Sequence, residues 1–287
     1  MKMKSIPVRQ ISPQDNRFSN EELKVRTIES LLNGHDLTHA LHRHDYYYMM
    51  LVEKANGIHE IDFIPYELAG NRIFLLKPGQ VHQLSVRKGG RGFIVQFSHA
   101  LIQNLGIPEM QTLKSVFHHS QYDLPEQDAA QLGSIFKLMV AEFTRKQLLH
   151  IEIIRSYLLA SIFILFRAID GGQDSKGINT FARQKLEEFH SLLEKHIATR
   201  KKTTEYAEML NLSNYQLNSI TTSLLGKNSS DVISEFVILE ARRLLLATTM
   251  QVNQVADALG FDDPAYFIRF FKKKTGTTPE ALRKNFR

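Results

Sequence analysis

The chain has 287 residues and a net charge of +6, and its 43% apolar and 23% charged residues argue against extensive disorder. It has no cysteine, which excludes disulfides, thiolate metal sites and a thiol nucleophile and suits a reducing compartment. The first twelve residues contain no apolar segment typical of a secretory signal, and the longest apolar stretch, 157–166, is about half a membrane span. We therefore expect a cytoplasmic protein that does not associate with membranes.

The length predicts two domains, each large enough to bury its own core. The charge is unevenly distributed between them, because residues 1–175 carry a net charge of +1 and residues 176–287 carry +5. The last 19 residues alone have seven basic side chains and one acidic one. This asymmetry suggests that the second part binds a polyanion, although a solvated basic surface would have the same composition.

Residues 1–125 are predicted to form a small antiparallel barrel or sandwich. From about residue 40 to residue 98, short apolar segments alternate at regular spacing with Gly, Pro and Asn turn signals, which is typical of such folds. We expect strands over 46–53, 58–64, 72–76, 81–86 and 92–98.

Two amphipathic helices are predicted within 126–170, with a break near Gln147, because apolar residues recur there at three- and four-residue spacing. The second helix is apolar on nearly all sides. This excess could pack against the barrel or against another subunit. We favour a second subunit, and therefore a homodimer with Leu158 and Ile162 in its interface.

Residues 171–179 are rich in glycine and polar residues and are predicted to be a linker. Residues 180–287 are predicted to be helical throughout. The expected helices cover 181–197, 204–211, 214–225, 230–248, 252–259, 264–275 and 279–285.

The C-terminal part contains an internal repeat, in which residues 206–212 resemble residues 255–261. Each copy predicts a short helix, a tight turn and a second helix. Ser213 is a candidate cap for one second helix, and Asp262 or Asp263, ahead of Pro264, for the other. This is the helix-turn-helix pattern, whose second helix enters the major groove of DNA. The alternative is an ordinary helical bundle with accidental similarity.

Three segments of this region resemble the signature of AraC-type transcription regulators: RRLL at 242–245, VADALGFDD at 255–263 and AYFIRFFKKKTGTTP at 265–279. The resemblance covers roughly residues 180–287. It implies a DNA-binding domain of two helix-turn-helix units joined by a long helix. It also implies that the barrel and helix pair form a sensor and dimerisation domain, and that RNA polymerase is a partner.

In the second unit, helical spacing predicts that Phe267, Phe270 and Phe271 face inward. Arg269 is then exposed and could donate to O6 and N7 of a guanine, whereas Lys272 and Lys273 are better placed to meet phosphates. An exposed arginine without a base partner is the alternative for Arg269.

The exposed residues of the first unit could recognise DNA bases through hydrogen bonds, but none of them carries a positive charge. Many family members have a basic residue at position 219, so this unit departs from the family pattern, and Lys201, Lys202 and Lys227 are expected to supply charge nearby. The candidate DNA-contacting residues of this unit are Tyr215, Gln216, Asn218, Ser219 and Thr222.

His42 and His44, together with His82 in the segment 78–82, resemble the two half-motifs of a cupin barrel. Where metal-binding cupins have a carboxylate, this chain has Tyr48. Three imidazoles alone could hold a divalent ion. We nevertheless interpret them as hydrogen-bonding residues and predict no metal and no cofactor. We also predict that the chain is not an enzyme, because it shows no catalytic triad order, phosphate loop or nucleotide-binding fingerprint.

The sequence thus predicts an α+β multidomain protein, with a cupin-like barrel and helix pair followed by an all-α domain of two helix-turn-helix units. We interpret it as a sequence-specific DNA-binding transcription regulator that responds to a small molecule. Two alternatives are a metal-dependent cupin enzyme with an appended nucleic-acid-binding domain and a constitutive regulator with a scaffold barrel. The candidate effector-binding residues, which offer aromatic walls and polar groups, are His44, Tyr46, Tyr48 and His82.

Overall fold

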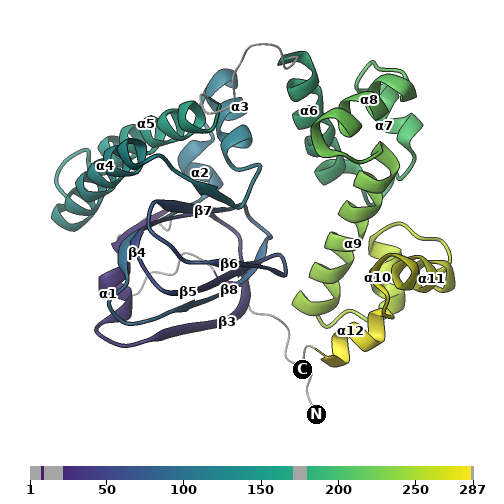
Figure 1. Cartoon of the computed structure of the whole chain (residues 1–287), viewed down its shortest axis with the longest axis horizontal. Coiled ribbons are helices and arrows are strands. Elements are labelled where there is room, and N and C mark those ends of the chain that lie inside the picture. Colours follow the sequence, from purple (N-terminus) through teal and green to yellow (C-terminus); the bar gives the residue numbers. More distant parts are fainter. Residues whose placement is uncertain (1–7, 10–21, 171–179, 286–287) are drawn as a thin grey trace. The chain divides into compact units, whose positions relative to one another are not determined.

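The computed structural model describes residues 8–9, 22–170 and 180–285, and the predicted linker 171–179 lies outside them. The chain divides near residue 175 into a sheet-rich N-terminal unit and a helical C-terminal unit (Figure 1). The predicted α+β fold class is therefore confirmed. None of the described helices combines the length and the hydropathy that crossing a membrane requires.

The N-terminal unit contains two five-stranded sheets, in which all pairs are antiparallel except β1 with β3. The first sheet has the order β1 (Val8–Arg9), β3 (Leu37–His44), β8 (Val81–Val86), β5 (Gly57–Ile61), β6 (Ile64–Glu67). The second has the order β10 (Gln121–Asp123), β7 (Arg72–Leu76), β4 (Tyr47–Lys54), β9 (Arg91–Phe97), β2 (Leu23–Thr27). The helices of this unit are α1 (Ile28–Leu32), α2 (His99–Ile102), α3 (Ile107–Val116), α4 (Glu126–Arg145) and α5 (His150–Asp170).

The predicted single strand over 58–64 is wrong, because the chain turns back within it. Asp62 and Phe63 have φ values of 49° and 69°, and they form a tight turn that pairs Ile61 with Ile64. Neither turn residue is glycine, and the alternation of apolar and polar residues continues through the turn. The sequence therefore contains no turn signal at these two positions that would distinguish this hairpin from one continuous strand.

The central strand β4 is buried on both faces, which explains its almost continuous apolar sequence. Tyr48, Met50 and Val52 point into the interior between the two sheets. Met49 and Leu51 point to the opposite face, where they join a core that includes residues of α3, α4 and α5. The described strands thus form a filled barrel with a helical cover on one side (Figure 1).

Leu158 and Ile162 of α5 belong to the core between α5 and the sheet, and each is only 1% exposed. The expectation that they lie in a dimer interface is wrong. Apolar residues do reach the surface of the helix pair, but at other positions of these helices, where Leu138, Phe163 and Phe166 are exposed. Helix α5 is therefore apolar on two faces, of which one packs in the core against the sheet and the other is exposed.

The C-terminal unit is entirely helical in its described residues, and its helix boundaries lie within two residues of the predicted ones. Its core contains the large buried side chains of Phe189, Tyr206, Leu217, Phe267 and Phe271. The helices are α6 (Thr180–His196), α7 (Thr203–Met209), α8 (Asn214–Leu225), α9 (Ser229–Ala247), α10 (Val252–Ala258), α11 (Pro264–Thr275) and α12 (Pro279–Asn285). The pairs α7–α8 and α10–α11 are the two repeats, and α9 joins them.

Candidate DNA interface and barrel site

Helix α11 begins at Pro264, and Asp263 caps it. The two carboxylate oxygens of Asp263 accept from the backbone N–H groups of Ala265 at 2.8 Å and Tyr266 at 3.1 Å, so Asp263 rather than Asp262 is the cap. Phe267 and Phe271 are fully buried, as predicted, and Phe270 is half-buried against the same core. This packing orients the opposite face of α11 outward.

The outward face of α11 has three basic side chains, Arg269, Lys272 and Lys273, all exposed. Arg269 Nη2 lies 3.5 Å from Asp263 Oδ2, and its side chain is 68% exposed. An ion pair this exposed contributes little to stability and is readily exchanged for another partner. The guanidinium is therefore available to an incoming acceptor, such as a base edge or a phosphate.

Helix α8 begins with a reciprocal cap between Ser213 and Gln216. Gln216 N–H donates to Ser213 Oγ at 3.2 Å, and Ser213 N–H donates to Gln216 Oε1 at 2.8 Å. The amide oxygen of Gln216 is thus engaged in the cap. Tyr215, Ser219 and Thr222 are exposed along this helix, and Tyr215 is 82% exposed.

Asn218, expected among the exposed residues of α8, is half-buried. Its Oδ1 accepts from the backbone N–H of Ser229 at 2.9 Å and from Ser229 Oγ at 2.5 Å. Ser229 is fully buried and is the first residue of α9. Asn218 therefore satisfies buried donors at the start of the connecting helix and ties α8 to α9.

Replacing Asn218 by alanine is expected to lower the free energy of unfolding of the C-terminal unit by about 1–3 kcal/mol, because two buried donors lose their acceptor. Urea denaturation followed by circular dichroism measures this change. The neighbouring exposed Ser219→Ala is the matched control and should shift stability by no more than about 0.5 kcal/mol. An Asn218→Ala variant as stable as the control, with relaxed DNA specificity, would support the predicted base-reading role instead.

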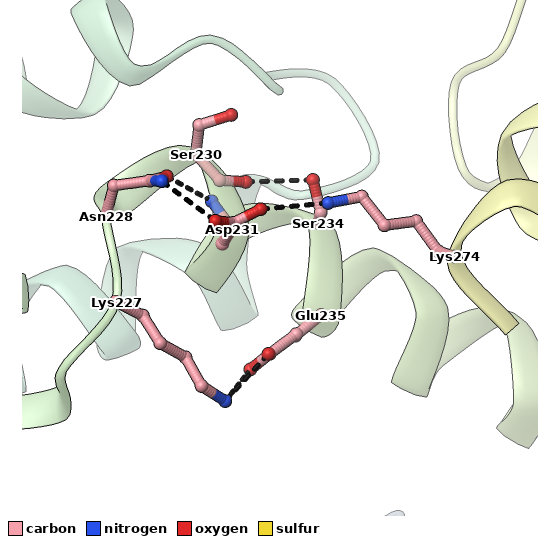
Figure 2. A network of polar contacts seen from close by, with 7 residues as sticks. All are labelled: Lys227, Asn228, Ser230, Asp231, Ser234, Glu235 and Lys274. Carbon is pink, nitrogen blue, oxygen red and sulfur yellow. Dashed lines mark hydrogen bonds and ion pairs between the residues drawn. The ribbon is translucent and has the colours of Figure 1, made fainter.

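Two of the three lysines expected to supply charge near α8 are bound within the unit. Lys227 Nζ pairs with both carboxylate oxygens of Glu235, at 2.7 and 2.9 Å (Figure 2). Lys201 Nζ donates to the carbonyl oxygen of Gly260 at 2.9 Å, and burial lowers the pKa of its ammonium group. Lys202 is exposed. The first unit is therefore even less cationic at its surface than its sequence suggests.

The start of α9 is also tied to α11, as Figure 2 shows. Asn228 Oδ1 accepts from the Asp231 N–H at 2.8 Å, and Lys274 Nζ lies 2.9 Å from Asp231 Oδ1. The Lys274 ammonium holds the pKa of the Asp231 carboxyl below its usual value. Because Asn218 ties the same end of α9 to α8, both α8 and α11 are attached to one helix terminus.

In the N-terminal unit, the four candidate effector residues meet inside the barrel, and each is at most 4% exposed. The rings of His44 and Tyr46 stack with their centroids 4.3 Å apart. Tyr46 Oη accepts from Gln96 Nε2 at 3.0 Å. Tyr48 Oη donates to Met50 Sδ at 3.3 Å, and burial raises the pKa of the Tyr48 hydroxyl, which therefore remains protonated.

The structure adds a residue that our sequence interpretation did not include, His59. Its Nε2 lies 2.8 Å from His82 Nδ1, and His82 Nε2 lies 3.1 Å from His44 Nε2. Burial lowers the pKa of His59 to about 3 and that of His82 well below its usual value, so both rings are neutral. The signal was present in the sequence, because His59 alternates in step with Ile61 on the inward face.

Comparison with known proteins assigns both units. Residues 30–160 match the family described as the AraC-like ligand binding domain, and residues 206–285 match the helix-turn-helix domain family. These matches define a transcription regulator with an N-terminal ligand-binding domain and a C-terminal DNA-binding domain. The chain belongs to the AraC-type transcription regulators.

The chain is similar to other regulators over most of its length. It is 23% identical to the uncharacterized HTH-type transcriptional regulator YfiF of Bacillus subtilis, over 85% of this chain and 78% of YfiF. It is 21% identical to the HTH-type transcriptional activator RhaR of Cronobacter sakazakii, over 86% and 87% of the two chains. Among solved structures, ToxT of Vibrio cholerae O395 is 17% identical, with a TM-score of 0.42, over 92% and 98%. The families and relatives matched are those of regulators and not of enzymes.

Proposed function

We propose that this chain is a cytoplasmic, homodimeric regulator that binds specific double-stranded DNA through α8 and α11. It responds to a ligand bound inside the barrel, contacts RNA polymerase and catalyses no reaction. The observation that carries the proposal is the pair of capped, outward-facing helices in a helix-turn-helix domain, of which α11 has an exposed basic face. Two such helices attached to one connecting helix suit two successive segments of the major groove.

The two units supply different kinds of contact to this proposed interface. Helix α11 offers Arg269 for a base and Lys272 and Lys273 for phosphates, whereas α8 offers the uncharged Tyr215, Ser219 and Thr222. Because α8 has no cation at this surface, its binding should release few counterions from the DNA. Helix α11 is therefore expected to account for most of the salt dependence of binding.

Sequencing the genomic fragments that the purified full chain retains tests the DNA-binding function directly. We expect a recurring motif with two parts about one helical turn apart, because each unit addresses its own major-groove segment. Binding of all fragments in proportion to their length, with no enriched motif, would contradict sequence-specific recognition. The contact with RNA polymerase is supported by the family relationship alone.

The homodimer proposal is supported by exposed apolar side chains on the helix pair. Phe163 and Phe166 are exposed on α5, as is Leu138 on α4. Arg167 Nη2 lies 3.4 Å from Gln131 Oε1 across the two helices, so their exposed faces adjoin. Large apolar side chains grouped on one surface are typical of protein–protein interfaces.

Replacing both Phe163 and Phe166 by glutamate should convert the dimer to a folded monomer, because the interface would bury two unpaired charges. Sedimentation at tens of micromolar checks the mass, and circular dichroism checks the fold. The control is Ile107→Glu, which adds a charge at an exposed apolar position of α3 outside the helix pair. A monomeric wild type, or a double variant that remains dimeric, would contradict the proposed interface.

A further inference from the structure

Four histidines lie inside the barrel on three adjacent strands of one sheet. His42 and His44 are on β3, His82 is on β8 and His59 is on β5. His42 and His82 are direct cross-strand partners. The four side chains are between 0% and 4% exposed. Burying so many polar rings together is unfavourable unless their nitrogen atoms have partners.

The hydrogen bonds of these rings determine where their lone pairs lie. His42 Nδ1 is 2.7 Å from the carbonyl oxygen of Ala40, which can only accept, so Nδ1 carries the proton and a neutral ring has its lone pair on Nε2. His82 Nδ1 contacts His59 Nε2, and His82 Nε2 faces His44 Nε2. One ring nitrogen from each of His42, His44 and His82 lies within 4.8 Å of the others.

We propose that His42, His44 and His82 together bind one first-row transition-metal ion, of the Zn²⁺ type, and that His59 positions His82 as a ligand. Two nitrogen ligands of a tetrahedral Zn²⁺ are roughly 3.3 Å apart, since each lies about 2.0–2.1 Å from the ion. The 3.1 Å between His44 Nε2 and His82 Nε2 is close to this separation.

The surroundings of two of the rings, those of His42 and His82, are also those of metal-binding histidines. A histidine ligand donates its other ring N–H to an acceptor, which fixes the tautomer. The Ala40 carbonyl is this acceptor for His42, and His59 Nε2 is the acceptor for His82 once a bound ion takes the lone pair of His82 Nε2.

The composition and the spacing of the cluster specify the class of ligand. Three imidazoles without a carboxylate favour zinc, copper, nickel or cobalt over magnesium or calcium. The centroid of the His82 ring lies 4.2 Å from that of His42 and 4.5 Å from that of His44. One nitrogen atom from each of the three rings can therefore reach the same ion. This proposal departs from our sequence-based expectation of no metal.

Metal titration of the full chain, after treatment with a chelator and dialysis, tests the proposal. We expect one Co²⁺ per chain with the visible absorption of a low-coordinate nitrogen site, displacement by Zn²⁺, and a higher melting temperature with Zn²⁺. His44→Gln and His82→Gln should abolish stoichiometric binding, and His59→Ala should weaken it about 10–100-fold. The exposed His99→Ala, in the same unit, is the control and should bind as the wild type does.

A measurement on the wild type keeps the test decisive if a variant does not fold. Electron paramagnetic resonance of the Cu²⁺-loaded chain should show coupling to nitrogen atoms of about three imidazoles. A wild type that binds no stoichiometric ion, a copper spectrum without imidazole coupling, or unchanged affinity in the folded glutamine variants would overturn the proposal. These measurements contain no DNA, so a chain that binds the ion but no DNA supports the metal site and contradicts only the proposed regulatory function.

Discussion

Replacing Leu158 by glutamate should unfold the N-terminal unit rather than dissociate a dimer. Leu158 is 1% exposed and packs in the core that joins α5 to the sheet. The substitution removes a buried leucine, which alone is worth about 2–5 kcal/mol, and places a carboxylate where it has no partner. A total of this size is comparable with the whole stability of an ordinary domain.

Circular dichroism and urea denaturation of Leu158→Glu measure this loss. The matched control is Phe163→Glu, five residues further along the same helix, where the side chain is 44% exposed. The control should keep its secondary structure and its cooperative unfolding. A folded, monomeric Leu158→Glu protein would show instead that Leu158 lies at a subunit interface, and the packing of α5 described above would be wrong.

Replacing Arg269 by alanine should weaken binding to the specific DNA site by about 1–3 kcal/mol, or roughly 5–150-fold, and relax the preference at one base pair. The guanidinium is exposed, and its one ion-pair partner among the described residues is the exposed Asp263 carboxylate, so little must be broken before it reaches a guanine. Fluorescence anisotropy with the specific duplex and with a scrambled duplex, each across a salt series, measures the effect.

Lys273→Ala provides the contrast on the same helix. Because Lys273 is a flexible point charge, its loss should weaken binding to both duplexes alike and reduce the salt slope by about one unit. If Arg269→Ala instead reduces binding to the specific and scrambled duplexes equally, Arg269 contacts a phosphate. If neither substitution changes binding, α11 is not the DNA-contacting helix.

The sequence by itself predicted the α+β class, the helix pair and all seven C-terminal helices. These features depend on local signals, because helical periodicity, the Ser213 and Asp263 caps and Pro264 act within a few residues. The orientation of α11 followed in the same way from its phenylalanines, which occupy one face of the helix. The helix-turn-helix repeat was visible because both copies preserve these local signals.

The tertiary structure alone decided which candidate residues are available for binding. Asn218 and Lys227 are residue types that commonly contact DNA. In the structure they bond instead to Ser229 and Glu235, which lie 11 and 8 residues away in the sequence. His59 joins His82 across 23 residues, and that pairing follows from sheet register rather than from any motif. Leu158 illustrates the same limit, since an apolar helix looks identical in sequence whether it packs on its own sheet or on a second subunit. Contacts between distant segments depend on how the elements pack, and periodicity along one element carries no record of that packing.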